Sequence, residues 1–110
     1  MATHAQRMVV ARELADWLRT RFGGVVSDVR LFGSVARGSD EEYSDIDLLI
    51  LVTRPLTAAE RDQLAARAYD LDLAHGTVTQ CVVRLDKVWT RPEVQSGGPA
   101  REVAREGAPV

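Results

Sequence analysis

The chain has 110 residues, of which 45% are hydrophobic and 27% charged, and its formal net charge is −2. These values are typical of one globular domain with a single core, and they argue against the broad basic surface that binds nucleic acid. The sequence has no apolar run long enough to span a bilayer, no signal-peptide pattern at its start and a single cysteine, Cys81. We therefore expect one cytoplasmic domain over residues 1–110, without an internal disulfide, membrane contact or extended nucleic-acid surface.

The first half of the chain predicts one helix and two strands. Thr3-x-x-Gln6 is a capping box that opens a helix to about residue 21, and Gly23 ends this helix. Strands are expected over residues 25–32 and 45–52, because both segments are apolar runs bounded by polar loops.

The second half predicts a helix, a strand and two short helices. A second capping box, Thr57-x-x-Glu60, opens a helix to about residue 73, and residues 77–84 alternate as a third strand. Short helices are expected over residues 86–95 and 99–106. The fold class predicted by this order is α/β (α+β): a small mixed sheet of three to four strands with helices packed on one face.

Two carboxylates open the second predicted strand. Successive side chains of a strand point to opposite faces, so Asp45 and Asp47 lie on one face, about 7 Å apart along the strand. Ile46 and alternate residues after it point into the core. Two neighbouring carboxylates repel each other unless a cation or a proton lies between them. The pair therefore predicts a cation site, although the solvent face of an ordinary edge strand would show the same pattern.

The turn before this strand offers groups that bind phosphate. Gly33 permits a sharp turn, and Ser34 is expected to cap a short helix whose free backbone N–H groups receive an anion. Arg37 adds a charge-assisted contact to the same anion. An anion site beside a carboxylate pair is suited to Mg²⁺ and a nucleotide, since Mg²⁺ binds one or two carboxylates together with substrate phosphates.

The loop between these two motifs, residues 39–44, is polar, and we expect it to be mobile. Its acidic residues, Asp40 among them, could add metal ligands, but a solvated acidic loop is the simpler interpretation. Ser44 precedes Asp45 and is expected to orient it through a hydrogen bond. His4, near the start of the chain, is expected to have no role.

Gly33-Ser34, ten intervening residues and Asp45-x-Asp47 together resemble the signature of the DNA polymerase β-like nucleotidyltransferase superfamily. The small size and the Gly-Ser-x-Ala-Arg-Gly form are most similar to its minimal nucleotidyltransferases (MNT), and the resemblance covers nearly the whole chain. It implies the polymerase β-like nucleotidyltransferase fold, with Asp45 and Asp47 as catalytic residues that hold Mg²⁺. The residues that would bind the nucleoside triphosphate, expected to be ATP, are Gly33, Ser34, Arg37 and Ser44.

One position departs from the family pattern. Active members carry a third aspartate on the later strand, whereas this chain has Gln80 or Thr79 at the matching place. A neutral amide can ligate a metal weakly or form a hydrogen bond, but it neither accepts a proton at pH 7 nor offsets the charge of a second cation. Asp72 or Asp86 could substitute only if the fold carries it several ångströms closer than the strand pattern implies. Binding of nucleotide and a first metal ion is therefore better supported than turnover.

The resemblance also implies a biological context. Many MNT proteins are encoded beside a helical HEPN-domain protein, and some are antitoxins that adenylylate a tyrosine of a HEPN ribonuclease toxin. We therefore expect Mg²⁺-dependent transfer of NMP, as AMP from ATP, to a protein acceptor, with a HEPN protein as partner and a homo-oligomer as a further option. The alternatives are a catalytically degenerate module that neutralises a HEPN partner by binding, and a stand-alone adenylyltransferase for small molecules.

Overall fold

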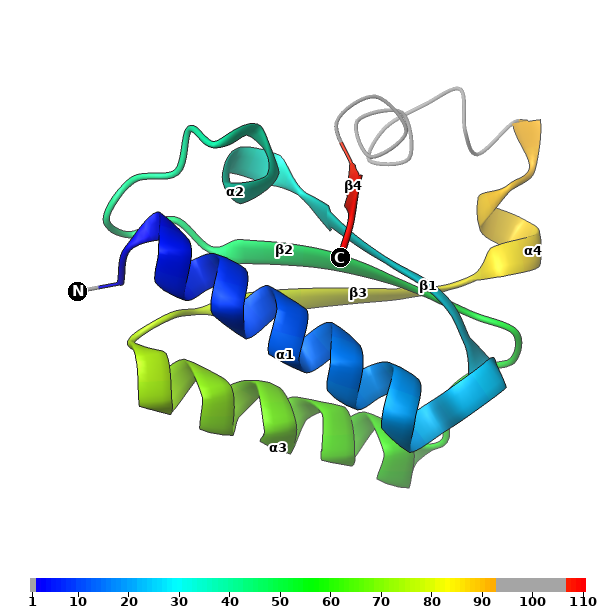
Figure 1. Cartoon of the computed structure of the whole chain (residues 1–110). Coiled ribbons are helices and arrows are strands. Elements are labelled where there is room, and N and C mark those ends of the chain that lie inside the picture. The colour runs from blue at the N-terminus through cyan, green and yellow to red at the C-terminus, as the bar shows by residue number, and fades with distance from the viewer. Residues whose placement is uncertain (1, 93–106) are drawn as a thin grey trace.

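A computed structural model describes residues 2–92 and 107–110 of the protein (Figure 1). The helices of this part of the chain are α1 (His4–Phe22), the short 3₁₀ helix η1 (Gly23–Val25), α2 (Gly33–Arg37), α3 (Ala58–His75) and α4 (Asp86–Trp89). The strands are β1 (Val26–Phe32), β2 (Ile46–Val52), β3 (Thr79–Leu85) and β4 (Ala108–Pro109). They form one mixed sheet in the order β3-β2-β1-β4, so the predicted fold class is confirmed.

Strand β2 lies in the interior of the sheet, between β1 and β3. It runs antiparallel to β1 and parallel to β3, and α3 supplies the crossover that a parallel pair requires. In this register Asp47 lies opposite Phe32 on β1 and opposite Gln80 on β3. The start of β2 is therefore flanked by the end of β1 and the start of β3.

Helices α1 and α3 lie side by side across one face of the sheet (Figure 1). The core between them and the sheet includes Leu14 and Leu18 of α1 together with Ile46, Leu48 and Ile50 of β2, all without solvent exposure. The alternate residues of β2 point to the other face, where a smaller cluster forms: Leu49, Leu51, Phe32, Val82 and Trp89. Asp47 shares this second face, because it is separated from Leu49 by two positions.

Both predicted capping boxes are present. The Thr3 hydroxyl accepts a hydrogen bond from the Gln6 backbone N–H, and the Gln6 side chain accepts one from the Thr3 N–H. Thr57 and Glu60 form the same reciprocal pair at the start of α3. Helix α3 continues to His75, two residues beyond the prediction, and Gly76 ends it in the left-handed conformation (φ 67°).

Two strand predictions need correction. Strand β3 begins at Thr79 rather than at residue 77, and the two-residue strand β4 was not predicted; its Ala108 and Pro109 pair with β1. The helix predicted over residues 86–95 is shorter than expected, because α4 ends at Trp89. Residues 93–95 and the helix predicted over residues 99–106 lie outside the described residues. Among the helices that the structure describes, none has the length and apolar character needed to cross a bilayer.

Candidate active site

The two predicted carboxylates lie at the start of β2. Asp45 directly precedes the strand and Asp47 is its second residue. The backbone N–H of Ile46, between them, donates to the carbonyl of Val78 (2.8 Å), which ties this point to the segment entering β3. Asp47 is thus held on a paired strand, on the face opposite α1 and α3, and Asp45 directly precedes that strand.

Gly33 brings the bend after β1 against the Asp47 carboxylate. Its φ of +74° lies in the left-handed region, which glycine adopts without strain. A Cβ atom added at Gly33 would lie 2.5 Å from Oδ2 of Asp47, closer than two such atoms can approach. The structure therefore brings the Gly-Ser motif and the acidic motif together, as the predicted site requires.

The electrostatics of this contact disfavour the charge of Asp47. Burial raises the pKa of the Asp47 carboxyl, the negative charge of Asp45 raises it further, and the positive charge of Arg37 opposes both effects. A bound cation would act in the same direction as Arg37, because it stabilises the ionised carboxylate. The structure thus places Arg37, a predicted phosphate ligand, within electrostatic range of the carboxylate pair.

The predicted role of Ser34 as a helix cap is wrong. Helix α2 begins at Gly33, its N-cap residue is Phe32, and no side chain caps it. The physical reason is that the positive φ of Gly33 makes the turn by itself and carries Ser34 into the first helical turn. Ser34 remains half-buried beside the bend.

Gln80 occupies the place on β3 beside the pair. It is opposite Asp47 in the parallel register, and its Nε2 donates a hydrogen bond to Oδ2 of Asp45 (2.8 Å). Thr79, the other residue considered for this place, points to the opposite face, because neighbouring strand residues alternate. The sequence analysis left Gln80 and Thr79 open, and the register decides for Gln80.

Asp72 does not replace the missing carboxylate. One oxygen of Asp72 accepts from the hydroxyls of Thr77 and Thr79 (2.6 and 2.8 Å), and the other accepts from the Thr79 backbone N–H (2.9 Å). Asp72 and Thr79 also line a groove of about 440 Å³ between α3 and the helix-covered face of β3. Asp86 begins α4, after the far end of β3. Neither residue joins the candidate site.

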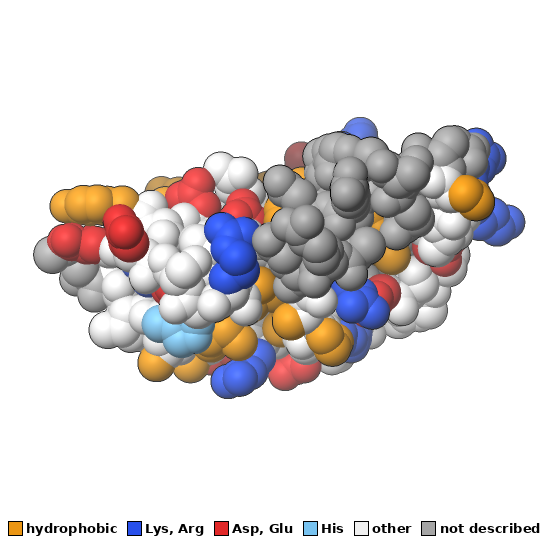
Figure 2. Space-filling view, turned by 90° about the horizontal axis from the view of Figure 1, so that it is seen from above, with side chains coloured by type: hydrophobic (Ala, Val, Ile, Leu, Met, Phe, Trp, Pro, Cys, Tyr) orange, Lys and Arg blue, Asp and Glu red, His pale blue; other side chains and the backbone are white. Residues whose placement is uncertain are grey.

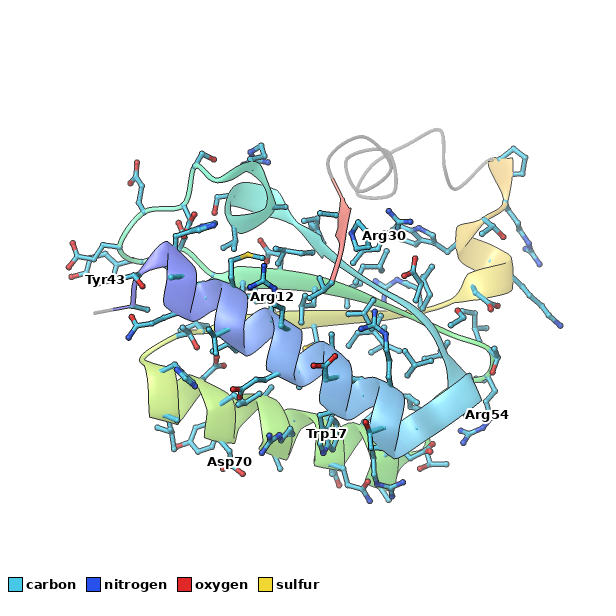
Figure 3. The ribbon with its side chains drawn as sticks, viewed as in Figure 1. Arg12, Trp17, Arg30, Tyr43, Arg54 and Asp70 are labelled. Carbon is cyan, nitrogen blue, oxygen red and sulfur yellow. The ribbon has the colours of Figure 1, made fainter. Side chains whose placement is uncertain are left out.

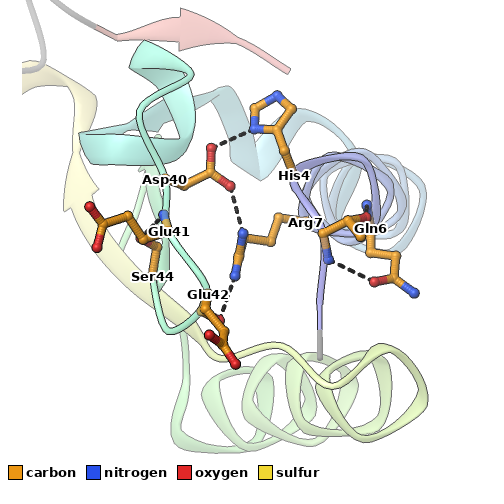
Figure 4. Close-up of polar contacts among 8 residues, drawn as sticks. His4, Gln6, Arg7, Asp40, Glu41, Glu42 and Ser44 are labelled. Atoms are coloured by element: carbon orange, nitrogen blue, oxygen red, sulfur yellow. Dashed lines mark hydrogen bonds and ion pairs between the residues drawn. The ribbon is translucent and has the colours of Figure 1, made fainter.

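The loop that leads to Asp45 is tied to helix α1 (Figure 4). Arg7, 3% exposed, donates from Nη1 to Oδ2 of Asp40 and from Nη2 to the carbonyl of Glu42, both at 2.7 Å. His4 Nδ1 lies 2.6 Å from the other Asp40 oxygen. Burial works to raise the pKa of Asp40, but the hydrogen bonds from His4 and Arg7 outweigh it and hold the pKa below its usual value.

This network corrects three predictions about the loop. Asp40 is a buried ion-pair partner with 1% of its side chain exposed, not a solvated acid, and His4 does have a partner. Ser44 accepts a hydrogen bond from the Glu41 N–H (2.7 Å) rather than orienting Asp45. Sequence reasoning missed Arg7, although its spacing gave a signal: a charged residue on the buried stripe of α1 needs a buried partner.

The surface around the loop is acidic, with an exposed aromatic ring. Seen from above, Asp and Glu side chains gather at the end of the molecule that carries the loop (Figure 2). Tyr43 projects outward from the same loop and is 85% exposed (Figure 3). Acidic side chains and an aromatic ring are therefore exposed together at this end of the domain.

The carboxylate pair fits one Mg²⁺ ion together with a nucleotide. Mg²⁺ in proteins is usually bound by one or two carboxylates, with substrate phosphates and water completing the octahedron. The described residues contain no group of three or more His, Cys, Asp or Glu side chains placed to hold a metal by themselves. An ion held by Asp45 and Asp47 would take its remaining ligands from substrate phosphates and water.

Comparison with known proteins agrees with the fold and the motif. The family model of the nucleotidyltransferase domain matches residues 11–103, so the chain belongs to the nucleotidyltransferase domain family. A solved structure of a candidate minimal nucleotidyltransferase is 26% identical, with a TM-score of 0.64 over 98% of this chain and 96% of that one. Within the family the protein is of the minimal, MNT type.

Two further relatives are informative. A candidate protein adenylyltransferase of Methanocaldococcus jannaschii is 29% identical over 80 residues, which are 73% of this chain and 75% of the relative. The structure of a tri-AMPylated Shewanella oneidensis HEPN toxin in complex with its MNT antitoxin includes a chain 20% identical to this one. That match covers 94% of this chain and 70% of the other, with a TM-score of 0.54, and shows a shared fold.

Proposed function

We propose that the protein transfers AMP from ATP to a hydroxyl group of a protein acceptor, and that this acceptor is a HEPN-domain partner which the transfer neutralises. The observation that carries the proposal is the contact of the Asp47 carboxylate with the bend at Gly33, because it joins a cation site to a phosphate site. The M. jannaschii relative supports adenylyl transfer to protein, and the S. oneidensis complex supports a HEPN acceptor.

Each residue of the site has a definite task in this reaction. Asp45 and Asp47 would hold Mg²⁺, which when bound supplies positive charge to the phosphates of ATP. The Ser34 hydroxyl and the backbone after Gly33 are suited to bind the β- and γ-phosphates, and the Arg37 guanidinium adds a positive charge. Ser44, which belongs to the predicted nucleotide site, shapes the turn that leads to Asp45.

The transfer itself needs alignment more than covalent help from the protein. The acceptor oxygen forms a bond to the α-phosphorus. The bond from that phosphorus to the oxygen that bridges the α- and β-phosphates breaks, and pyrophosphate leaves. The acceptor loses its hydroxyl proton to solvent. Site residues contribute by fixing the phosphates in line with the incoming oxygen, which converts a bimolecular encounter into an oriented one.

Intact-mass measurement of the partner tests the proposal. The HEPN protein is incubated with this protein, ATP and Mg²⁺, and we expect it to gain the mass of one or more AMP residues. Asp45→Ala should abolish the gain, whereas Asp62→Ala, which removes an exposed carboxylate of α3, should leave it unchanged. An unmodified partner under these conditions would contradict the proposal.

A second candidate function is neutralisation of the partner by binding alone. It is favoured by one observation: an amide, Gln80, stands where active family members place a third carboxylate. Protection of cells from the partner separates the two functions. If Asp45→Ala protects as well as the natural chain, binding is sufficient; if protection is lost while the two proteins still co-purify, the chemistry is needed.

A further inference from the structure

Gln80 is oriented by the hydrogen bond that it makes. The Asp45 carboxylate only accepts hydrogen bonds, so the side of the Gln80 amide that faces it at 2.8 Å must be the NH₂ group. The amide oxygen, which is the only atom of this side chain that can ligate a cation, is on the other branch of the amide. Gln80 therefore presents a donor, not a metal ligand, to the carboxylate pair.

The strand register holds Gln80 in place beside Asp45. Gln80 is exposed, and an isolated exposed hydrogen bond contributes little free energy. Its backbone, however, lies in the parallel ladder opposite Asp47, between the pairs Ile46–Thr79 and Leu48–Cys81. The amide is thus carried to Asp45 by the sheet and occupies one lone-pair direction of Oδ2.

The acidic side chains of the site also favour a single cation. The site holds two carboxylates: Asp47 lies against the bend at Gly33, and Asp45 accepts the hydrogen bond from Gln80. Asp72, an acid of α3 beside β3, accepts hydrogen bonds from Thr77 and Thr79 with both of its oxygens, on the other face of the sheet. A second divalent ion would share the phosphate oxygens of the nucleotide, but it would find no third protein carboxylate beside this pair among the described residues.

We propose that Gln80 limits this site to one divalent cation per bound nucleotide, by holding Asp45 with its NH₂ group and by withholding the carboxylate that a second cation would need. Gln80 is accordingly a positioning residue, which acts through Asp45. The inference rests on the proposed function only in placing a nucleotide at Gly33 and Ser34. It concerns the number of cations and holds whether or not AMP is transferred.

Counting Mn²⁺ ions tests the inference without measuring activity. The protein is saturated with a non-hydrolysable ATP analogue and titrated with Mn²⁺, and the ions bound per complex are counted by electron paramagnetic resonance of the free ion. We expect one Mn²⁺ for the natural chain and two for Gln80→Glu, which has nearly the same shape but adds a carboxylate. Gln63→Glu, the same change at an exposed position of α3, is the matched control and should keep one.

Three results would overturn the inference: two ions bound by the natural chain, one ion bound by Gln80→Glu, or a second ion gained by Gln63→Glu as well. Circular dichroism melting of each variant checks that it is folded, which we expect because both glutamines are exposed. Failure of AMP transfer in the mass experiment leaves the ion count unaffected, so the two proposals fail separately.

Discussion

The space between Gly33 and Asp47 is too small for any side chain: a Cβ on Gly33 would lie 2.5 Å from Oδ2 of Asp47. The bend after β1 and the start of β2 are therefore in direct contact, and the Asp47 carboxylate borders the backbone of the Gly-Ser motif. A methyl group at this point would have to displace either the carboxylate or the bend.

Gly33→Ala is expected to weaken cation binding by about 10- to 100-fold, the usual cost of disturbing the groups that orient a metal ligand. It should also destabilise the fold by about 1 to 2 kcal/mol, because alanine is strained at positive φ. Gly38→Ala is the control: Gly38 has nearly the same φ (+71°), but its Cβ would meet nothing within 4 Å. Mn²⁺ titration of both variants distinguishes the effect of the contact with Asp47 from the effect of backbone strain at positive φ. Equal affinities would show that the Gly33 contact does not matter.

Asp47→Asn is expected to raise the melting temperature by a few degrees at pH 7 while abolishing cation binding. Because burial and Asp45 raise the pKa of Asp47, the folded state binds this proton more tightly than the unfolded state. Ionised Asp47 therefore costs stability above that raised pKa, and stability recovers as the pH falls through it. Thermal melts with and without Mg²⁺ check both effects: the ion should stabilise the natural chain and leave Asp47→Asn unchanged.

Arg7→Met is expected to destabilise the protein by about 3 kcal/mol, the lower end of the cost of breaking a buried ion pair, because His4 remains beside Asp40. Urea unfolding measures this change. Arg19→Met provides the comparison, since Arg19 pairs with Asp16 at 3.9 Å on the exposed surface of the same helix and should cost less than about 1 kcal/mol.

The same ion pair predicts a pH dependence. The pKa of Asp40 is lower in the folded state, so its stabilising contribution is fully present above the unfolded value near pH ~4. The contribution is lost as the pH falls from there through the depressed folded pKa. The stability difference between the natural chain and Asp40→Asn should therefore shrink below pH ~4, and a constant difference down to the acid transition would contradict this account.

Cys81 is expected to react slowly with iodoacetamide in the folded protein. Burial raises the pKa of its thiol to about 11, and the charge of Asp72 adds to the effect. At pH 8 the reactive thiolate is then about 100-fold scarcer than for an ordinary thiol, before any effect of access. Labelling rates followed by mass spectrometry, in buffer and in urea, should differ by at least this factor.

Local patterns predicted the fold well where neighbours in sequence decide it. The capping boxes at Thr3 and Thr57 were predicted because each is completed within one helical turn. Strand β2 was predicted because its apolar run is buried on both faces. Strand β4 was missed because two residues, one of them Pro109, show no period and owe their pairing to β1, almost eighty positions away.

The candidate site was likewise predicted correctly only where residues close in sequence decide the structure. The joining of the Gly-Ser bend to Asp47 could be predicted because both motifs flank one hairpin. The role of Ser34 was misjudged, since the choice between cap and first turn depends on the φ of a single glycine. The partner of Arg7 could not be predicted, because the contact to Asp40 spans 33 positions and only the folded loop brings the two together.

The central position of β2 has a consequence for how the protein opens. Both edges of this strand are paired, so its amide hydrogens should exchange with solvent only when the whole domain unfolds. Asp47, as a residue of β2, is thus attached to the slowest-exchanging unit of the molecule, and Asp45 directly precedes it. A ligand that reaches Asp47 would therefore meet a carboxylate whose backbone stays in place until the domain unfolds.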